Sequence, residues 1–388
     1  MHLPDIESLA RTALPEMTAD LKALVELETP SNDKELLNTG LAAVERWAHD
    51  RLGPPDESQR HDGGPHGDLL ELLYRGNTPT TVLMLCHYDT VWQAGTLADW
   101  PFTVTGEGST ARASGPGTFD MKCGLTQAVW ALRLLRQTGA PHPTVRLLLN
   151  GDEEIGSPAS RPHIERLSEH AAATLVCEAA AGPEGALKTA RKGVGLFEVT
   201  VEGIEAHAGL EPERGASAVH ALAELVTRIA ALGAPQDGTT VNVGLIGGGT
   251  GRNVVAGRAH CGIDVRITDP AEAARIDAGL AALRPSDPRV TVTVTGGWNR
   301  PAMVPNPASR VLFKQAEEAA AELGWTARET AVGGASDGNF VAALNRPVLD
   351  GLGAVGAGAH ARGEHVLLDH VPTRTALLAG LLAAYATE

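Results

Sequence analysis

The first 190 residues alternate between short apolar runs and longer amphipathic segments. The apolar runs have the length and flanking polar residues of buried strands, and they lie at 69–74, 81–86, 145–149 and 174–176. Helical spacing of apolar residues is found at 5–28, 34–52 and 124–137. Strands that alternate with helices in this way predict an α/β fold, with a mainly parallel mixed sheet flanked by helices.

A different rhythm begins near residue 190. Strands and helices are predicted in the order βαββαβ, at 194–201, 215–232, 240–246, 256–267, 270–284 and 289–295. This order is typical of a ferredoxin-like domain. The first pattern resumes after residue 301. We therefore expect residues 1–189 and 302–388 to form one domain, into which residues 190–301 are inserted.

Composition excludes several classes of function. The formal net charge is −15, which argues against unaided binding to nucleic acid or to an anionic membrane. The sequence has no run of eighteen apolar residues and no signal peptide, so we expect a cytoplasmic protein. The four cysteines form no CxxC pair and are expected to be reduced, and Cys86 and Cys177 are expected to be small core residues.

Metal-ligand side chains follow the apolar runs. His87 and Asp89 come directly after the run at 81–86 and share one side of it, as a ligand and its orienting partner would. Imidazoles and carboxylates that stand at strand ends or in Gly-rich loops occur at His87, Asp120, Glu153, Glu154, Glu178 and His365. Such a set suits two Zn²⁺ ions sharing one carboxylate, with Co²⁺ or Mn²⁺ as alternatives, and leaves one carboxylate as a general base.

Eight short motifs occur in one order along nearly the whole chain. They are H-Y-D-T (87–90), G-P-G-T-F-D-M-K (115–122), G-D-E-E-I-G-S (151–157), C-E (177–178), E-A-H-A-G (205–209), R-N-V-V-A (252–256), G-G-A-S-D (333–337) and E-H (364–365). In this order, the motifs resemble those of the dizinc family of glutamate carboxypeptidases, aminoacylases and acetylornithine or succinyl-diaminopimelate deacylases.

The resemblance implies a role for each residue of the set. One zinc would be held by His87 and Glu178, and the other by Glu154 and His365. Asp120 would bridge the two ions and precede a non-proline cis peptide bond. Glu153 would act as the general base, and Asp89 would orient His87.

The resemblance also assigns residues in the insertion. His207 would reach the active site of a partner subunit and stabilise the oxyanion, which implies a homodimer joined through the inserted domain. Arg300 and Asn253 would contact the substrate, Arg300 at a carboxylate. In the metal-dependent interpretation, backbone N–H groups near Gly334 would line the substrate pocket.

The favoured function is hydrolysis of the amide bond of a small-molecule or peptide substrate, an N-acyl amino acid or peptide with a free C-terminal carboxylate, by a glutamate carboxypeptidase. An acetylornithine-type deacetylase is the alternative. A serine esterase is a more remote one, because Gly334–Gly338 matches G-x-S-x-G with Ser336 as the nucleophile. That interpretation could use Asp350 with His365 or His370, but it leaves His87, Asp120, Glu153, Glu154 and Glu178 unexplained.

Overall fold

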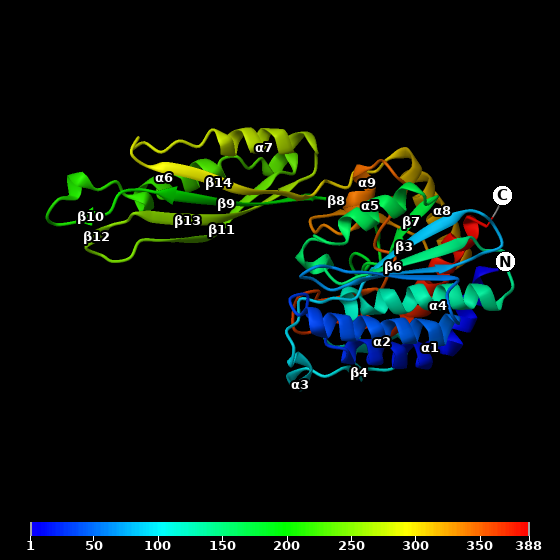
Figure 1. Cartoon of the computed structure of the whole chain (residues 1–388). Coiled ribbons are helices and arrows are strands. Elements are labelled where there is room, and N and C mark those ends of the chain that lie inside the picture. The colour runs from blue at the N-terminus through cyan, green and yellow to red at the C-terminus, as the bar shows by residue number, and fades with distance from the viewer. Residues whose placement is uncertain (1, 387–388) are drawn as a thin grey trace. The chain divides into compact units, whose positions relative to one another are not determined.

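The computed structural model describes residues 2–386. Its central feature is a six-stranded mixed sheet (Figure 1). The strands follow one another across this sheet as β1 (Glu57–His61), β2 (Leu69–Tyr74), β6 (Thr144–Asn150), β3 (Thr81–His87), β7 (Ala173–Val176) and β16 (Val348–Leu349). The last four are parallel, whereas β1 and β2 pair in antiparallel fashion. The predicted fold class is confirmed.

Helices cover both faces of this sheet. On one side, α1 (Leu3–Glu26), α2 (Lys34–Leu52), α4 (Cys123–Gln137) and α10 (Val371–Ala384) pack together, and α5 (Arg161–Glu169) and α9 (Gly338–Ala343) lie on the other (Figure 1). α8 (Pro307–Glu322) packs against α10 and β16. All six residues of β2 are buried, because strands covered on both faces expose neither set of side chains.

A small antiparallel sheet joins two Gly-rich loops that are far apart in the sequence. Its strands are β17 (Gly356–Ala357), β18 (His365–Leu367), β5 (Arg112–Ser114) and β4 (Thr103–Thr105). Sequence patterning gave no sign of this sheet, nor of β1 and α5, because short or exposed elements carry little periodicity. The remaining short elements of this part of the chain are α3 (Thr96–Asp99), β8 (Leu187–Arg191) and β15 (Glu329–Val332).

The inserted segment has its own core. Strands β9 (Gly193–Glu202), β11 (Thr240–Gly248), β13 (Arg258–Ile267) and β14 (Thr291–Arg300) form an antiparallel sheet in the order β11-β13-β9-β14. Buried residues of α6 (Ala218–Ala230) and α7 (Ala271–Ala281) pack with one face of β9 and β13. The predicted βαββαβ order is confirmed. A separate ribbon pairs β10 (Ala206–His207) with β12 (Val254–Val255).

Contacts divide the chain into two compact units. One comprises the chain up to Ala190, Pro305–Val332 and the chain from Ser336 onward, and the other comprises Arg191–Val304 and Gly333–Ala335. These boundaries lie within a few residues of those expected from the sequence, apart from the short segment Gly333–Ala335. Within the described part of the chain, none of the helices combines the length and apolarity needed to span a bilayer.

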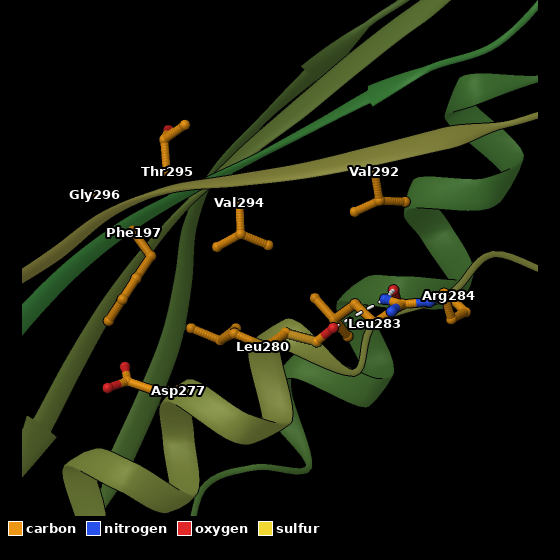
Figure 2. A pocket seen from close by; sticks show the side chains of 10 residues that line it. Phe197, Asp277, Leu280, Leu283, Arg284, Val292, Val294, Thr295 and Gly296 are labelled. Carbon is orange, nitrogen blue, oxygen red and sulfur yellow. Dashed lines mark hydrogen bonds between the residues drawn. The ribbon is translucent and has the colours of Figure 1, made fainter.

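A cavity of about 350 Å³ lies between α7 and β14. Figure 2 shows Phe197, Leu280 and Val294 lining it with apolar groups, and Asp277 and Arg284 adding charge. None of the residues with predicted catalytic or metal-binding roles lines this cavity.

Candidate metal centre

His87 stands at the carboxyl end of β3, where a parallel sheet presents its strand ends. Its side chain is buried, and Nε2 lies 3.1 Å from Asp120 Oδ1 and 3.2 Å from Glu178 Oε1. The peptide between Asp120 and Met121 is cis, as the resemblance implied. Three of the predicted ligands are therefore in contact.

Asp89 supports both His87 and the segment that follows β6. Its Oδ1 lies 3.3 Å from His87 Nδ1. The same carboxylate accepts the backbone N–H groups of Glu153 (3.3 Å) and Glu154 (3.2 Å) and the hydroxyl of Ser31 (2.7 Å). Asp89 is fully buried. This contact agrees with the predicted orienting role, while Ser31 is a partner that the sequence interpretation missed.

The second imidazole at the carboxylates belongs to His360. Its Nε2 lies 3.0 Å from Glu154 Oε2 and 3.2 Å from Asp120 Oδ2. Asp120 thus stands between two histidines. His365 instead lies in β18, with Nδ1 2.9 Å from the carbonyl oxygen of Gly363. His365 makes no ion pair within residues 2–386, so His360, and not the predicted His365, lies against these carboxylates.

The difference between the two histidines has a simple origin. Two histidines, five residues apart, occupy one Gly-rich loop, and the sequence interpretation chose the one next to Glu364. Strand pairing of β18 with β5 then directs His365 elsewhere, whereas His360 adopts a left-handed backbone conformation with φ 60°. Such a conformation is uncommon outside glycine and is typical of special functional positions.

Hydrogen bonds fix the loop that carries Glu153 and Glu154. Asp152 Oδ2 accepts the N–H groups of Ala159 (2.7 Å) and Ser160 (3.1 Å). Asp337, from the G-G-A-S-D motif, accepts the side-chain amide of Asn150 at 2.8 Å. The loop after β6 is therefore held at both of its ends.

The electrostatics of the cluster couple histidines to carboxylates. Burial opposes ionisation of Asp120, but hydrogen bonds from His360 and His87 outweigh it and hold the pKa of Asp120 well below its ordinary value. Hydrogen bonds to Asp120 and then Glu154 raise the pKa of His360 to about 11. Burial raises the pKa of Glu154 to about 7, against the opposing effect of His360.

The side chains present fit a divalent cation. Ligand atoms of His87, Asp120 and Glu154 lie within 4.8 Å of one another, as do those of His87, Glu153 and Glu178. Glu154 Oε1 is buried and has no hydrogen-bond partner among residues 2–386. An orphaned carboxylate oxygen is costly unless a ligand satisfies it. Oxygen and imidazole donors are those that zinc accepts in proteins.

Comparison with known proteins agrees with this chemistry. Residues 83–384 match the family described as peptidase family M20/M25/M40. The chain belongs to this family. It is therefore a hydrolase of the metallopeptidase class, and both the family resemblance noted in the sequence and the predicted enzyme class are confirmed.

Relatives in the M20/M25/M40 family cover most of the chain. Carboxypeptidase G2 of a Pseudomonas species is 28% identical over 376 residues, which are 95% of this chain and 89% of that protein. A succinyl-diaminopimelate desuccinylase of Stenotrophomonas maltophilia is 26% identical, over 78% of this chain and 84% of that one. The solved structure of aminopeptidase PepT from Bacillus cereus shares the fold, with a TM-score of 0.77, 20% identity, and coverage of 96% and 99%.

The serine-hydrolase alternative does not fit a metallopeptidase family or the geometry. Ser336 is buried, and its hydroxyl donates to Asp350 at 2.5 Å. Among the described residues, no histidine forms a hydrogen bond with Ser336, and its φ is not in the left-handed region. The residue therefore lacks a general base and the strained turn that exposes a nucleophile.

The unit of Arg191–Val304 and Gly333–Ala335 holds four of the predicted site residues. His207 lies exposed in the β10–β12 ribbon, and the carbonyl oxygen of Asn253 accepts the N–H of Ala208 beside it, at 2.9 Å. The ribbon thus brings His207 and Asn253 together. Arg300 is buried at the end of β14. Gly334 is exposed, and its carbonyl oxygen accepts the Arg191 guanidinium at 3.1 Å.

Proposed function

We propose that the enzyme hydrolyses the amide bond of an N-acyl amino acid or small peptide with a free C-terminal carboxylate, as a glutamate carboxypeptidase. The observation that carries the proposal is the buried cluster with its orphaned Glu154 oxygen. Similarity to carboxypeptidase G2 along nearly the full length supports this substrate class. A deacetylase of the acetylornithine type is the second candidate, supported by similarity to a succinyl-diaminopimelate desuccinylase.

Two zinc ions are the proposed cofactors, with Co²⁺ or Mn²⁺ as alternatives for the same donors. His87 and Glu178 would hold one ion, Glu154 and His360 the other, and Asp120 would be shared. When bound, such ions would lower the pKa of a coordinated water to about 7 and would polarise the scissile carbonyl.

Glu153 is the proposed general base. Its side chain is buried, and one of its oxygens lies within 4.8 Å of ligand atoms of His87 and Glu178. Its backbone is held by Asp89. From this position, Glu153 would take a proton from the attacking water and give it to the leaving amine.

His207 is the proposed oxyanion donor, and its hydrogen bonds support that role. Nδ1 accepts the backbone N–H groups of Gly209 and Leu210, both at 3.1 Å. An imidazole nitrogen that accepts carries no proton, so the neutral ring has its proton on Nε2. The exposed His207 therefore presents an N–H donor. Asn253, on the same ribbon, is the accompanying substrate contact, and Arg300 and Gly334 keep their predicted roles in this proposal.

A homodimer joined through the inserted unit is part of the proposal, since His207 would act on the substrate of the partner subunit. The support is an apolar sheet edge. β11 is an edge strand, and Leu245 and Ile246 on it are 72% and 66% exposed. Exposed apolar edge strands are ready to pair with another chain. Sedimentation of the active enzyme as a monomer only would contradict this part.

A hydrolysis panel tests the function. The zinc-loaded enzyme is given N-acyl glutamates, folate, acetylornithine and simple dipeptides, and release of the free amine is measured. We expect the highest kcat/KM for substrates with a C-terminal glutamate. Preference for acetylornithine would favour the deacetylase, and turnover that survives a chelator would contradict metal-dependent hydrolysis.

A further inference from the structure

Glu364 carries a fully buried carboxylate that accepts four N–H groups. Oε1 accepts the backbone N–H of Phe119 at 2.7 Å and that of Asp120 at 3.0 Å. Oε2 accepts the backbone N–H of Gly117 at 3.2 Å and the indole N–H of Trp92 at 3.0 Å. Each carboxylate oxygen of Glu364 thus accepts two N–H groups, and the exposed fraction of the residue is 0%.

Three of these donors belong to the turn that carries Asp120. This turn leads into α4, and the Asp120 side chain stands between His87 and His360. Gly117 has φ 70°, and a Cβ at this position would lie 2.5 Å from the side chain of Thr90. Thr90 therefore packs closely against this turn, and three of the turn's backbone N–H groups donate to Glu364.

The backbone of Glu364 belongs to the other loop of the centre. Its N–H donates to the carbonyl oxygen of Ala361 at 3.0 Å, directly after His360. Its own carbonyl oxygen accepts the hydroxyl of Ser114 at 2.7 Å. Gly358 approaches so closely that a Cβ there would lie 3.0 Å from the Cα of Glu364. One residue thus joins the loop of His360 to the turn of Asp120.

We propose that Glu364 is a positioning residue that sets Asp120 and His360 relative to each other, and so tunes one half of the two-metal site. The inference rests on the two-metal part of the proposed function. His87 and Glu178 meet at the ends of β3 and β7 and have no hydrogen bond to Glu364. Loss of the Glu364 carboxylate therefore acts on the ion held by Glu154 and His360 through both His360 and Asp120, and on the other ion only through Asp120.

Glu364→Gln tests the role, because an amide keeps the shape but turns one acceptor into a donor that faces two N–H groups. Zinc affinities of the metal-free protein are measured by competition with a chelator. We expect one of the two affinities to fall by about 10–100-fold, the usual effect of changing a residue that supports a metal ligand. The other affinity should fall by a smaller factor, because that ion depends on Glu364 only through Asp120, and at saturating zinc the loss should be in kcat rather than in KM.

Asp20→Asn is the matched control. Asp20 is another buried carboxylate, which accepts the indole N–H of Trp130 at 2.8 Å and the guanidinium of Arg51, and it has no contact with the metal centre. The Asp20→Asn substitution should lower thermal stability and leave both zinc affinities unchanged. Trp92→Phe, which removes one of the four donors, should weaken the same zinc affinity as Glu364→Gln, to a smaller extent.

The outcomes are separable. If both Glu364→Gln and Trp92→Phe keep both zinc affinities and lose only thermal stability, as Asp20→Asn should, the positioning role is overturned. If the wild type binds two zinc ions but hydrolyses no member of the panel, the substrate proposal fails and the zinc comparison still decides the role of Glu364.

Discussion

The two histidines of the metal centre are held in opposite ways. His87 ends a central parallel strand, and its side chain is 1% exposed, whereas the side chain of His360 is 53% exposed and its backbone lies in a Gly-rich loop. His87 contacts Asp89, Asp120 and Glu178. Among the charged groups of the described residues, His360 contacts only the proposed ligands Asp120 and Glu154.

This difference shows why one histidine was predictable and the other was not. Backbone hydrogen bonds to β6 and β7 fix the end of β3, so the side-chain direction of His87 follows from strand alternation. The direction of His360 depends on a left-handed backbone and on Glu364, whose carboxylate is bound to a turn more than 240 residues earlier. The direction of a side chain at a strand end can be predicted from the local sequence pattern, whereas that of a side chain in a loop cannot.

The largest expected effect concerns Glu153, the proposed general base. Glu153→Gln should lower kcat by about 10²–10⁴-fold, the usual contribution of a general base, because the amide cannot take up a proton. Both zinc ions should remain, which metal analysis of the purified variant would show. Glu26→Gln, on the exposed end of α1, is the control and should keep wild-type turnover. Undiminished kcat in Glu153→Gln would remove it as the base.

The next largest effect is a difference in unfolding free energy between substitutions of the two histidines. In metal-free protein, His87→Ala leaves buried carboxylates without their cation and should cost about 3–5 kcal/mol, the usual loss when a buried ion pair is broken. His360→Ala should cost about 1 kcal/mol or less, because the His360 side chain is half-exposed and its ion pairs are screened by solvent. Urea unfolding in the presence of a chelator measures both, and equal losses would contradict the comparison.

Zinc binding should distinguish His360 from His365. His360→Ala removes a proposed ligand and should weaken one zinc affinity by about 100-fold. This is the upper limit of the loss seen when a residue that only supports a ligand is changed. His365→Ala should leave both affinities within about twofold. Chelator competition on the two purified variants decides between them. The reverse result would restore the original prediction of His365.

Proton release gives a smaller and independent measure. The raised pKa of His360, about 11, means that its imidazole is protonated in the metal-free protein at neutral pH. A zinc ligand must be neutral, so binding releases this proton, and apparent affinity should rise by about tenfold per pH unit below that pKa. Calorimetry in buffers of different ionisation enthalpy counts the protons. His360→Ala should release one proton fewer, and an unchanged count would argue against its role.

The smallest effect concerns Ser31. Ser31→Ala removes a hydroxyl that donates to buried Asp89 at 2.7 Å. One buried hydrogen bond is worth about 0.5–1.5 kcal/mol, so unfolding free energy should fall by that amount. Ser58→Ala, whose hydroxyl bonds to exposed Glu45, should have almost no effect. A loss at Ser58 as large as that at Ser31 would show that the Asp89 contact has no special weight.

Local periodicity in the sequence determined the two halves of the fold and the side of the centre built on strand ends. Apolar runs precede His87, Asp89, Glu153, Glu154 and Glu178. Pairing of these runs as strands of one sheet was enough to bring the five residues near one another. The order βαββαβ was equally legible, because alternation and helical spacing are properties of neighbouring residues.

Which loop residues lie at the candidate metal centre was decided only by the tertiary structure. The choice of His360 over His365, the four N–H groups on Glu364 and the contact of Ser31 with Asp89 depend on pairings between distant segments. The small sheet of β17, β18, β5 and β4 brings two Gly-rich loops together, and neither loop carries a periodic signal. Glycine leaves the backbone many conformations, so long-range hydrogen bonds, and not local preference, select the one that is adopted.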